Sequence, residues 1–154
     1  MRKNLLLALT SLMLVACQHN VVYTDFCTLP NNGWKADSTV CFQPTIEDTA
    51  ADYQFQLILR HTDAYQYQNL WMFLEVKNDS AILSQDTIEC YLADDRGNWL
   101  GGGVSVHELP LMFDAAYHFP HSGQYQITIQ QGMRSENLEG IKEIGVKIIT
   151  NGKK

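Results

Sequence analysis

The residues whose types and spacing come closest to a metal site are two histidines three positions apart, His118 and His121. A bound metal ion needs a third and a fourth ligand. His107, Glu108 and Asp114 are candidates for these positions in sequence only. Because a proline between the two histidines fixes an irregular loop, we expect exposed loop histidines without a metal ion.

Other segments match catalytic or ligand-binding motifs only in part. Residues 94–98 (DDRGN) suggest a calcium loop, but they lack its spacing and its distal glutamate, and a hairpin turn with Gly97 at positive φ explains them. Residues 101–105 (GGGVS) lack the spacing of a nucleophile elbow and the helix that follows a phosphate-binding loop. Adjacent acids such as Glu47 and Asp48 point to opposite faces of a strand. The sequence therefore predicts no catalytic residue, no metal site, no cofactor and no enzyme.

One cysteine has a setting that does indicate covalent chemistry. Arg2 and Lys3 precede an apolar run over residues 5–15, which is typical of a signal peptide. As a helix the run would rise about 16 Å, half of the ~30 Å core of a bilayer, so it is not a transmembrane span. Residues 14–17 (LVAC) resemble the bacterial lipobox, whose cysteine receives a diacylglyceryl group and, after cleavage, an N-acyl chain such as palmitate. The alternative is a leader with a chance cysteine at position 17.

These features divide the chain into two parts. We expect residues 1–16 to be a lipoprotein signal peptide and residues 17–154 to be one domain anchored through lipid on Cys17. Gln18 stands where an aspartate would favour retention at the inner membrane, and no acidic cluster follows the cysteine. The sequence therefore favours the periplasmic face of the outer membrane. The formal net charge of −6 argues against nucleic acid as a partner.

Three further cysteines follow the predicted lipid site. An oxidising periplasm permits one disulfide, and Cys27 with Cys41 would close a short loop. The alternative is three buried, reduced thiols. Cys90 lies at period two between Ile88 and Leu92, which predicts a core position.

The mature chain alternates apolar and polar residues with the period of a β-strand. The clearest run is residues 53–60, and the almost wholly apolar residues 70–76 predict a central strand covered on both faces. About eight short strands with turn residues between them predict an all-β, antiparallel β-sandwich, with a jelly roll as one form. The predicted strands are residues 21–26, 40–46, 53–60, 70–76, 87–92, 104–109, 124–130 and 144–149.

Aromatic residues cluster around two predicted loops. Tyr65, Tyr67 and Asn69 precede the strand at residue 70, and Trp99 follows the turn at residues 94–98. On a sandwich such residues could stack on sugar rings or form a protein-binding surface. Alternatively, they cap the ends of the core.

Several segments together resemble the GldH family of gliding motility lipoproteins of Bacteroidetes. They follow one another in order over nearly all of the mature chain, and the pair Cys27 and Cys41 is not part of the family pattern. The matching positions are Cys17, Tyr23, and residues 34–37, 58–60, 65–71, 86–89, 92–101, 123–125, 131–134 and 138–145.

The resemblance implies a non-enzymatic lipoprotein of the outer membrane. Such a protein would act as an accessory or assembly component of the gliding motility and type IX secretion machinery, with other lipoproteins of that machinery as partners. The alternative function is an envelope glycan-binding module, which the predicted sandwich and its aromatic residues favour. Whether a small molecule binds is open at this stage.

Overall fold

The computed structural model describes residues 21–151, so the predicted signal peptide and Cys17 lie outside the described residues. Within that range the regular structure is β-strand, which confirms the predicted all-β class. Eight strands have four residues or more, and three have two. The strands are β1 (Val21–Thr28), β2 (Trp34–Lys35), β3 (Thr39–Phe42), β4 (Thr45–Ile46), β5 (Tyr53–His61), β6 (Asn69–Asn78), β7 (Ile82–Tyr91), β8 (His107–Tyr117), β9 (Gly123–Gln131), β10 (Asn137–Leu138) and β11 (Ile141–Thr150).

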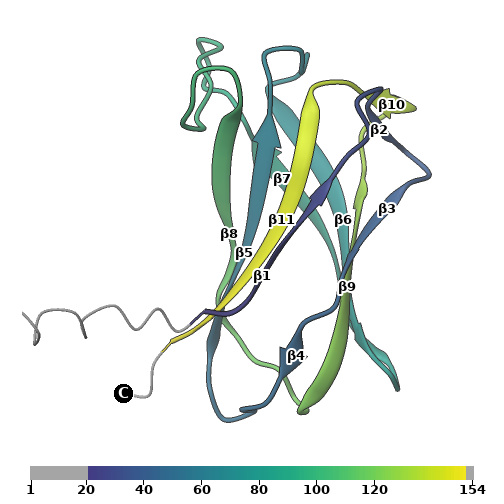
Figure 1. Ribbon diagram of the computed structural model, residues 1–154, viewed down its shortest axis with the longest axis vertical. Helices are drawn as coiled ribbons and strands as arrows, with labels where there is room; N and C mark the ends of the chain where they lie inside the picture. The colour runs from purple at the N-terminus through teal and green to yellow at the C-terminus, as the bar shows by residue number, and fades with distance from the viewer. Residues whose placement is uncertain (1–20, 152–154) are drawn as a thin grey trace, which may run out of the picture.

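The strands form two antiparallel sheets packed face to face (Figure 1). The first sheet has the order β1-β11-β5-β8. The second has the order β3-β9-β6-β7, and β4 continues β3 along the edge of β9. A two-stranded ribbon of β2 and β10 lies at one end of the sandwich (Figure 1).

Inward-pointing residues of both sheets form the core between them. As predicted, β5 buries every second residue from Tyr53 to Leu59, and β9 buries Tyr125, Ile127 and Ile129. Trp34 closes one end of the core: its ring is fully buried, and its Nε1 donates to the carbonyl oxygen of Ser38 at 3.0 Å. Period-two burial of this kind leaves each sheet an outer face of its own.

The strand predicted at residues 104–109 is wrong at both ends. Gly102 and Glu108 exchange two backbone hydrogen bonds, which close a tight loop, and Val104 at its tip is 91% exposed. β8 begins only at His107 and continues past Pro110 to Tyr117. A proline is tolerated there because β8 is an edge strand that pairs with β5 alone.

Two other predicted strands have different limits in the structure. The segment predicted at residues 40–46 is two strands, β3 and β4, because Pro44 interrupts it. The strand predicted at residues 87–92 is the second half of β7, which begins at Ile82.

The prediction that residues 70–76 are covered on both faces is also wrong. The segment lies in β6, which is a central strand between β9 and β7. Its inward residues are buried, but Trp71 and Phe73 on the outer face are 37% and 49% exposed. The apolar run therefore reflects one buried face and one exposed aromatic face.

The strand directions define two ends of the sandwich. Val21 pairs with Ile149, so the described chain starts and finishes at the same end, which we call the proximal end. The opposite, distal end carries the loop between β5 and β6 and the loop between β7 and β8 (Figure 1). The distal segments are residues 29–38, 62–68, 92–106 and 132–140, and the proximal ones are residues 43–52, 79–81 and 118–122.

The three described cysteines are free thiols, so the disulfide that Cys27 and Cys41 could form is absent. Cys27 packs against the core from β1, whereas Cys41 lies exposed on the outer face of β3. The alternative of three buried thiols is also wrong, because Cys90 alone of the three is buried. Burial raises the pKa of the Cys90 thiol to about 11, and its predicted core position is confirmed.

Candidate functional site

A hollow near the distal end of the second sheet contains two of the residues predicted from the sequence. Tyr67 and Asn69 line it together with Trp71, and its volume is about 450 Å³. Residues on the neighbouring segment complete it. We call this site the aromatic hollow; its lining is Tyr67, Asn69, Trp71, Gly132, Met133, Arg134 and Ser135.

Hydrogen bonds hold the first side of the hollow. β6 begins at Asn69, and alternation along the strand places Asn69 and Trp71 on the outer face. The Asn69 Nδ2 donates to Glu89 Oε1 at 2.6 Å. The Tyr67 hydroxyl lies 2.6 Å from the Ser135 Oγ, which joins the two sides of the hollow.

The second side is held by a buried glutamine. Gln131, at the end of β9, is 2% exposed. Its Nε2 donates to the carbonyl oxygen of Ser135 at 2.9 Å, and its Oε1 accepts from the backbone N–H of Met133 at 2.8 Å. The N–H of Gly132 donates to the carbonyl oxygen of Trp71 at 2.7 Å. The loop is therefore fixed against β6, and the exposed side chain of Arg134 is presented from a rigid base.

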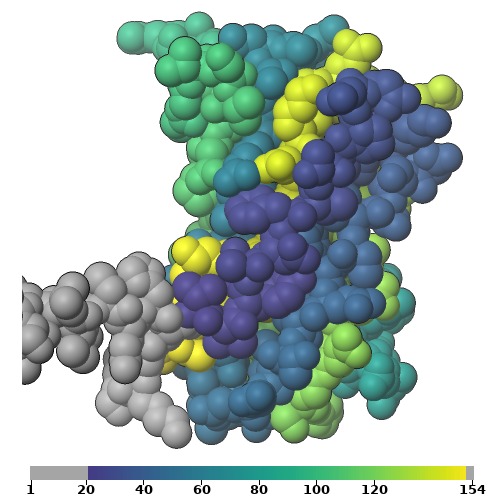
Figure 2. Space-filling model, in the orientation of Figure 1, coloured from purple at the N-terminus to yellow at the C-terminus, as the bar shows by residue number. Residues whose placement is uncertain are grey.

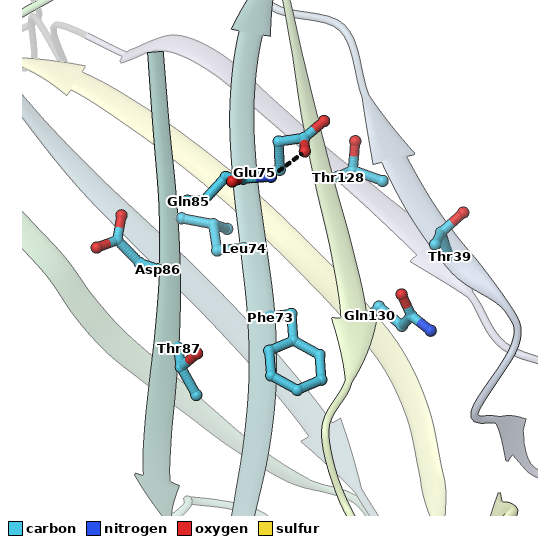
Figure 3. Close-up of a pocket in the computed structure, with 9 residues that line it drawn as sticks. All are labelled: Thr39, Phe73, Leu74, Glu75, Gln85, Asp86, Thr87, Thr128 and Gln130. Carbon is cyan, nitrogen blue, oxygen red and sulfur yellow. Dashed lines mark hydrogen bonds between the residues drawn. The ribbon is translucent and has the colours of Figure 1, made fainter. Parts of the chain in front are cut away.

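A second depression, the polar groove, crosses the middle of the same outer face (Figure 3). Its volume is about 470 Å³. The half-exposed ring of Phe73 lies in it between Thr87 and Gln130, with the ring face turned toward the viewer in Figure 3. The groove is lined by Thr39, Phe73, Leu74, Glu75, Gln85, Asp86, Thr87, Thr128 and Gln130.

The strand register explains why these side chains meet. Phe73 lies opposite Thr87 of β7 and Gln130 of β9. One pair further along, Glu75 lies opposite Gln85 and Thr128. Four strands thus contribute amide, hydroxyl and carboxylate groups around one aromatic ring.

The aromatic hollow and the polar groove adjoin at Gly132. A Cβ added there would lie 3.2 Å from the ring of Phe73 and 3.4 Å from the backbone of Trp71. The absence of a side chain at Gly132 therefore leaves the edge of the Phe73 ring uncovered. The two depressions form one band along the outer face of the second sheet.

The structure separates the other two predicted surface residues from the hollow. Tyr65 is 2% exposed, so its prediction as a surface residue is wrong. Its hydroxyl donates to the carbonyl oxygen of Asn69 at 2.7 Å, and its ring supports that of Tyr67 at 5.6 Å. Trp99 is half-buried against the imidazole of His61, with ring centroids 4.5 Å apart.

Trp99 belongs to a cluster that anchors the long loop of residues 92–106. The Oδ1 of Asp63 accepts from Trp99 Nε1 at 2.8 Å and lies 2.8 Å from His107 Nε2. The bonds from His107 and then Trp99 lower the pKa of the Asp63 carboxyl. Burial lowers the pKa of His61, whose Nε2 has no hydrogen-bond partner. The cluster positions the loop, whose exposed apolar residues Leu100, Val104 and Val106 lie at the distal end.

Metal ligands do not come together in the described part of the chain. Among residues 21–151, no group of three or more His, Cys, Asp or Glu side chains could hold a metal ion. His118 and His121 are exposed residues of the loop between β8 and β9, as predicted. Over the same range no helix is long and apolar enough to cross a membrane.

Sequence reasoning missed Trp71, Phe73, Met133 and Arg134 as site residues. Trp71 and Phe73 fall within an apolar run, and only the exposure of alternate residues distinguishes them from core residues. Met133 and Arg134 are about 60 positions away from Trp71 and reach it through the pairing of β6 with β9. A signal for this site was present in the sequence: the aromatic residues Trp71 and Phe73 are two positions apart, so they lie on the same face of a strand.

Comparisons with known proteins agree on one family. The family model of the GldH lipoprotein matches residues 21–148. A protein of Christiangramia forsetii named gliding motility lipoprotein GldH homolog is 30% identical over 147 residues, which are 90% of each chain. The gliding motility lipoprotein GldH of Flavobacterium johnsoniae is 26% identical over 151 residues, which are 93% of each chain.

Similarity to solved structures is much weaker. Dimeric latent PorU from Porphyromonas gingivalis is 8% identical, with a TM-score of 0.36 over 88% of this chain and 14% of that chain. The structure of infectious bursal disease virus Gx strain is 12% identical, with a TM-score of 0.40 over 83% of this chain and 29% of that chain. Such a likeness carries no functional argument.

The match of the family model covers all the described strands but the last residues of β11, and the two relatives match over nine-tenths of their length. The chain belongs to the GldH lipoprotein family of gliding motility, whose members are membrane-anchored proteins of the cell envelope.

Proposed function

We propose that this protein is a non-enzymatic accessory or assembly component of the gliding motility and type IX secretion machinery. It acts from the periplasmic face of the outer membrane, held there by diacylglyceryl and N-acyl chains on Cys17. Its partners are other lipoproteins of that machinery, and it contacts them through the distal end of the sandwich.

The aromatic hollow is the observation that carries this proposal. Tryptophan, tyrosine, methionine and arginine are enriched at protein interfaces, and the hollow presents Trp71, Tyr67, Met133 and Arg134 together. The hollow is also preformed, since Gln131 and Ser135 fix its walls. Binding there costs less ordering entropy than binding to a flexible loop.

The position of the hollow fits an anchored adaptor. The described chain begins at Val21, four residues after Cys17, and Val21 lies at the proximal end. The hollow and the exposed apolar residues Leu100 and Val104 lie at the opposite end. A lipid anchor at the proximal end therefore leaves the distal end free to meet a partner.

The test is a pull-down of the lipidated protein from its own membranes after mild cross-linking, read by mass spectrometry. We expect recovery of other gliding or type IX lipoproteins with the wild-type protein. The Trp71→Ala variant should lower this recovery about tenfold or more, as for a residue at the centre of an interface.

The matched control is Met112→Ala, which removes an exposed apolar side chain, 51% accessible, from the outer face of the first sheet. Recovery with this variant should equal that of the wild type. Recovery of bulk outer-membrane proteins alone, or equal losses in the two variants, would contradict the proposal.

A further inference from the structure

The polar groove differs in chemistry from the aromatic hollow beside it. Its lining offers side-chain amides from Gln85 and Gln130, three threonine hydroxyls, and carboxylates from Glu75 and Asp86. The single exposed apolar side chain in the lining is the ring of Phe73. Such a surface exposes more polar area than the aromatic hollow does, and it has many short-range donors and acceptors around one flat ring.

Two of these polar groups are fixed before any ligand arrives. The Gln85 Nε2 donates to Glu75 Oε2 at 2.8 Å (Figure 3). The Gln130 Nε2 donates to the carbonyl oxygen of Ala36, which holds the carboxamide in one orientation. The second oxygen of Glu75 and the amide oxygens of Gln85 and Gln130 stay available as acceptors. A groove with oriented acceptors suits a ligand that carries many hydroxyl groups.

Charge narrows the class of ligand further. The lining residues include two carboxylates, Glu75 and Asp86, and no lysine, arginine or histidine. Like charges would repel a uronate, a sulfate or a phosphate chain. From this chemistry we propose that the polar groove binds a neutral oligosaccharide, with a sugar ring stacked on Phe73 and its hydroxyls hydrogen-bonded to Glu75, Gln85 and Gln130. This goes beyond the proposed docking of a partner protein at the aromatic hollow.

The shape of the surface supports a chain rather than a single sugar. Trp71 and Phe73 lie two residues apart on one face of β6, so their Cα atoms are about 7 Å apart along the strand. Gly132 adds no side chain beside them, and a Cβ there would lie 3.2 Å from the Phe73 ring. The far end of an oligosaccharide held on Phe73 therefore reaches toward Trp71.

The test is calorimetric titration of the purified lipidated protein, kept in a detergent without a sugar head group. The probes are four neutral hexasaccharides, cellohexaose, chitohexaose, laminarihexaose and maltohexaose, with hexagalacturonate as the anionic comparison. We expect saturable binding of at least one neutral probe and no binding of hexagalacturonate. The Phe73→Ala variant should bind that probe about tenfold more weakly or worse.

Three further variants make the result specific. Phe73→Leu keeps an apolar side chain without a flat ring, so its binding should also be weak. Gln130→Ala should weaken binding by a smaller factor. Ile82→Ala, a 56% exposed apolar position at the start of β7, should bind as the wild type does. Thermal melting curves establish that each variant is folded.

Three results would overturn the proposal. The first is the absence of binding of all four neutral probes at about 5 mM, which would detect a site of millimolar affinity. The second is unchanged binding in a folded Phe73→Ala variant. The third is stronger binding of hexagalacturonate than of any neutral probe. None of these results affects the recovery of partner proteins, so this inference and the proposed function fail separately.

Discussion

The outer faces of the two sheets are built from similar residue types but differ in how those residues are used. On the first sheet, Arg60 donates to Glu108 and to Glu143 and lies over the ring of Phe26, with the guanidinium carbon 4.3 Å from the ring centroid. On the second sheet, the rings of Trp71 and Phe73 have no such cover. The first face covers the ring of Phe26 with Arg60, and the second leaves its aromatic rings to solvent.

Figure 2 shows the side of the molecule on which β1 lies. β1, in purple, runs across the front of the molecule and is flanked by the yellow residues of β11 (Figure 2). Phe26 of β1 packs on Gly145 of β11, where an added Cβ would lie 2.5 Å from the ring. An exposed aromatic residue therefore indicates a binding surface only when neighbouring side chains do not already cover it.

The first prediction compares one phenylalanine from each face. Phe26→Ala should destabilise the fold by about 2–3 kcal/mol, because it uncovers the surface around Gly145 and leaves Arg60 without its ring. Phe73→Ala should cost about 1 kcal/mol or less, because half of its surface is already exposed. Denaturant unfolding of both variants measures the two values. Equal losses would remove the distinction between the faces.

The second prediction compares the glycines that these two rings touch. Gly145→Ala should cost about 2 kcal/mol, since the new methyl group meets a ring held in place by Arg60. Gly132→Ala meets the free ring of Phe73 at 3.2 Å, and that ring can turn aside, so we expect about 0.5 kcal/mol. Thermal melts rank the pair, and a larger loss for Gly132→Ala would show that the second face is the more rigid one.

Part of this contrast was accessible from the sequence. The strict alternation from Tyr53 to Leu59 and from Tyr125 to Ile129 predicted two buried strand faces, and both predictions are confirmed. The prediction failed for residues 70–76, because the sequence pattern does not distinguish aromatic residues on an exposed strand face from apolar residues of the core. The continuation of β8 past Pro110 was not predicted, because a proline is compatible with a strand at the edge of a sheet, and the sequence does not give the order of the strands.

The candidate site was predictable only where its residues are close in sequence. Tyr67 and Asn69 lie in one segment, and both line the aromatic hollow. Tyr65 differs from Tyr67 in burial because its hydroxyl reaches the backbone of Asn69, a contact that no local pattern indicates. Arg134 enters the site through long-range pairing of β9 with β6.

The third prediction concerns Arg60, the cation that pairs with two carboxylates on the outer face of the first sheet. Arg60→Met leaves Glu108 and Glu143 without their shared partner, so the melting temperature should fall at pH 7. The loss should shrink at high ionic strength, where salt screens the repulsion between the two carboxylates. Lys77→Met on the second sheet is the control, since Lys77 has no ion pair within residues 21–151. A loss in the control as large as that of Arg60→Met would contradict the comparison.

The smallest expected effect on stability concerns His61, which lies in the cluster with Asp63, Trp99 and His107 at the distal end. Burial lowers the pKa of His61, so the unfolded chain takes up a proton at a higher pH than the folded chain does. The stability that neutral His61 contributes is therefore complete above pH ~6.5 and declines as the pH falls from there through the folded-state pKa. Unfolding free energies measured between pH 7.5 and pH 5 should show this decline, and His61→Phe should make it shallower. An unchanged slope would mean that His61 takes up its proton equally in both states.

We propose that partner proteins contact the distal part of the outer face of the second sheet, where the aromatic hollow lies, and in-cell photo-cross-linking is the sharpest test of this contact. A photoreactive amino acid is placed at Tyr91, beside the aromatic hollow, or at Met112 on the first sheet, which are 59% and 51% exposed. We expect adducts with envelope lipoproteins from position 91 and none from position 112. Adducts from position 112 alone would contradict it.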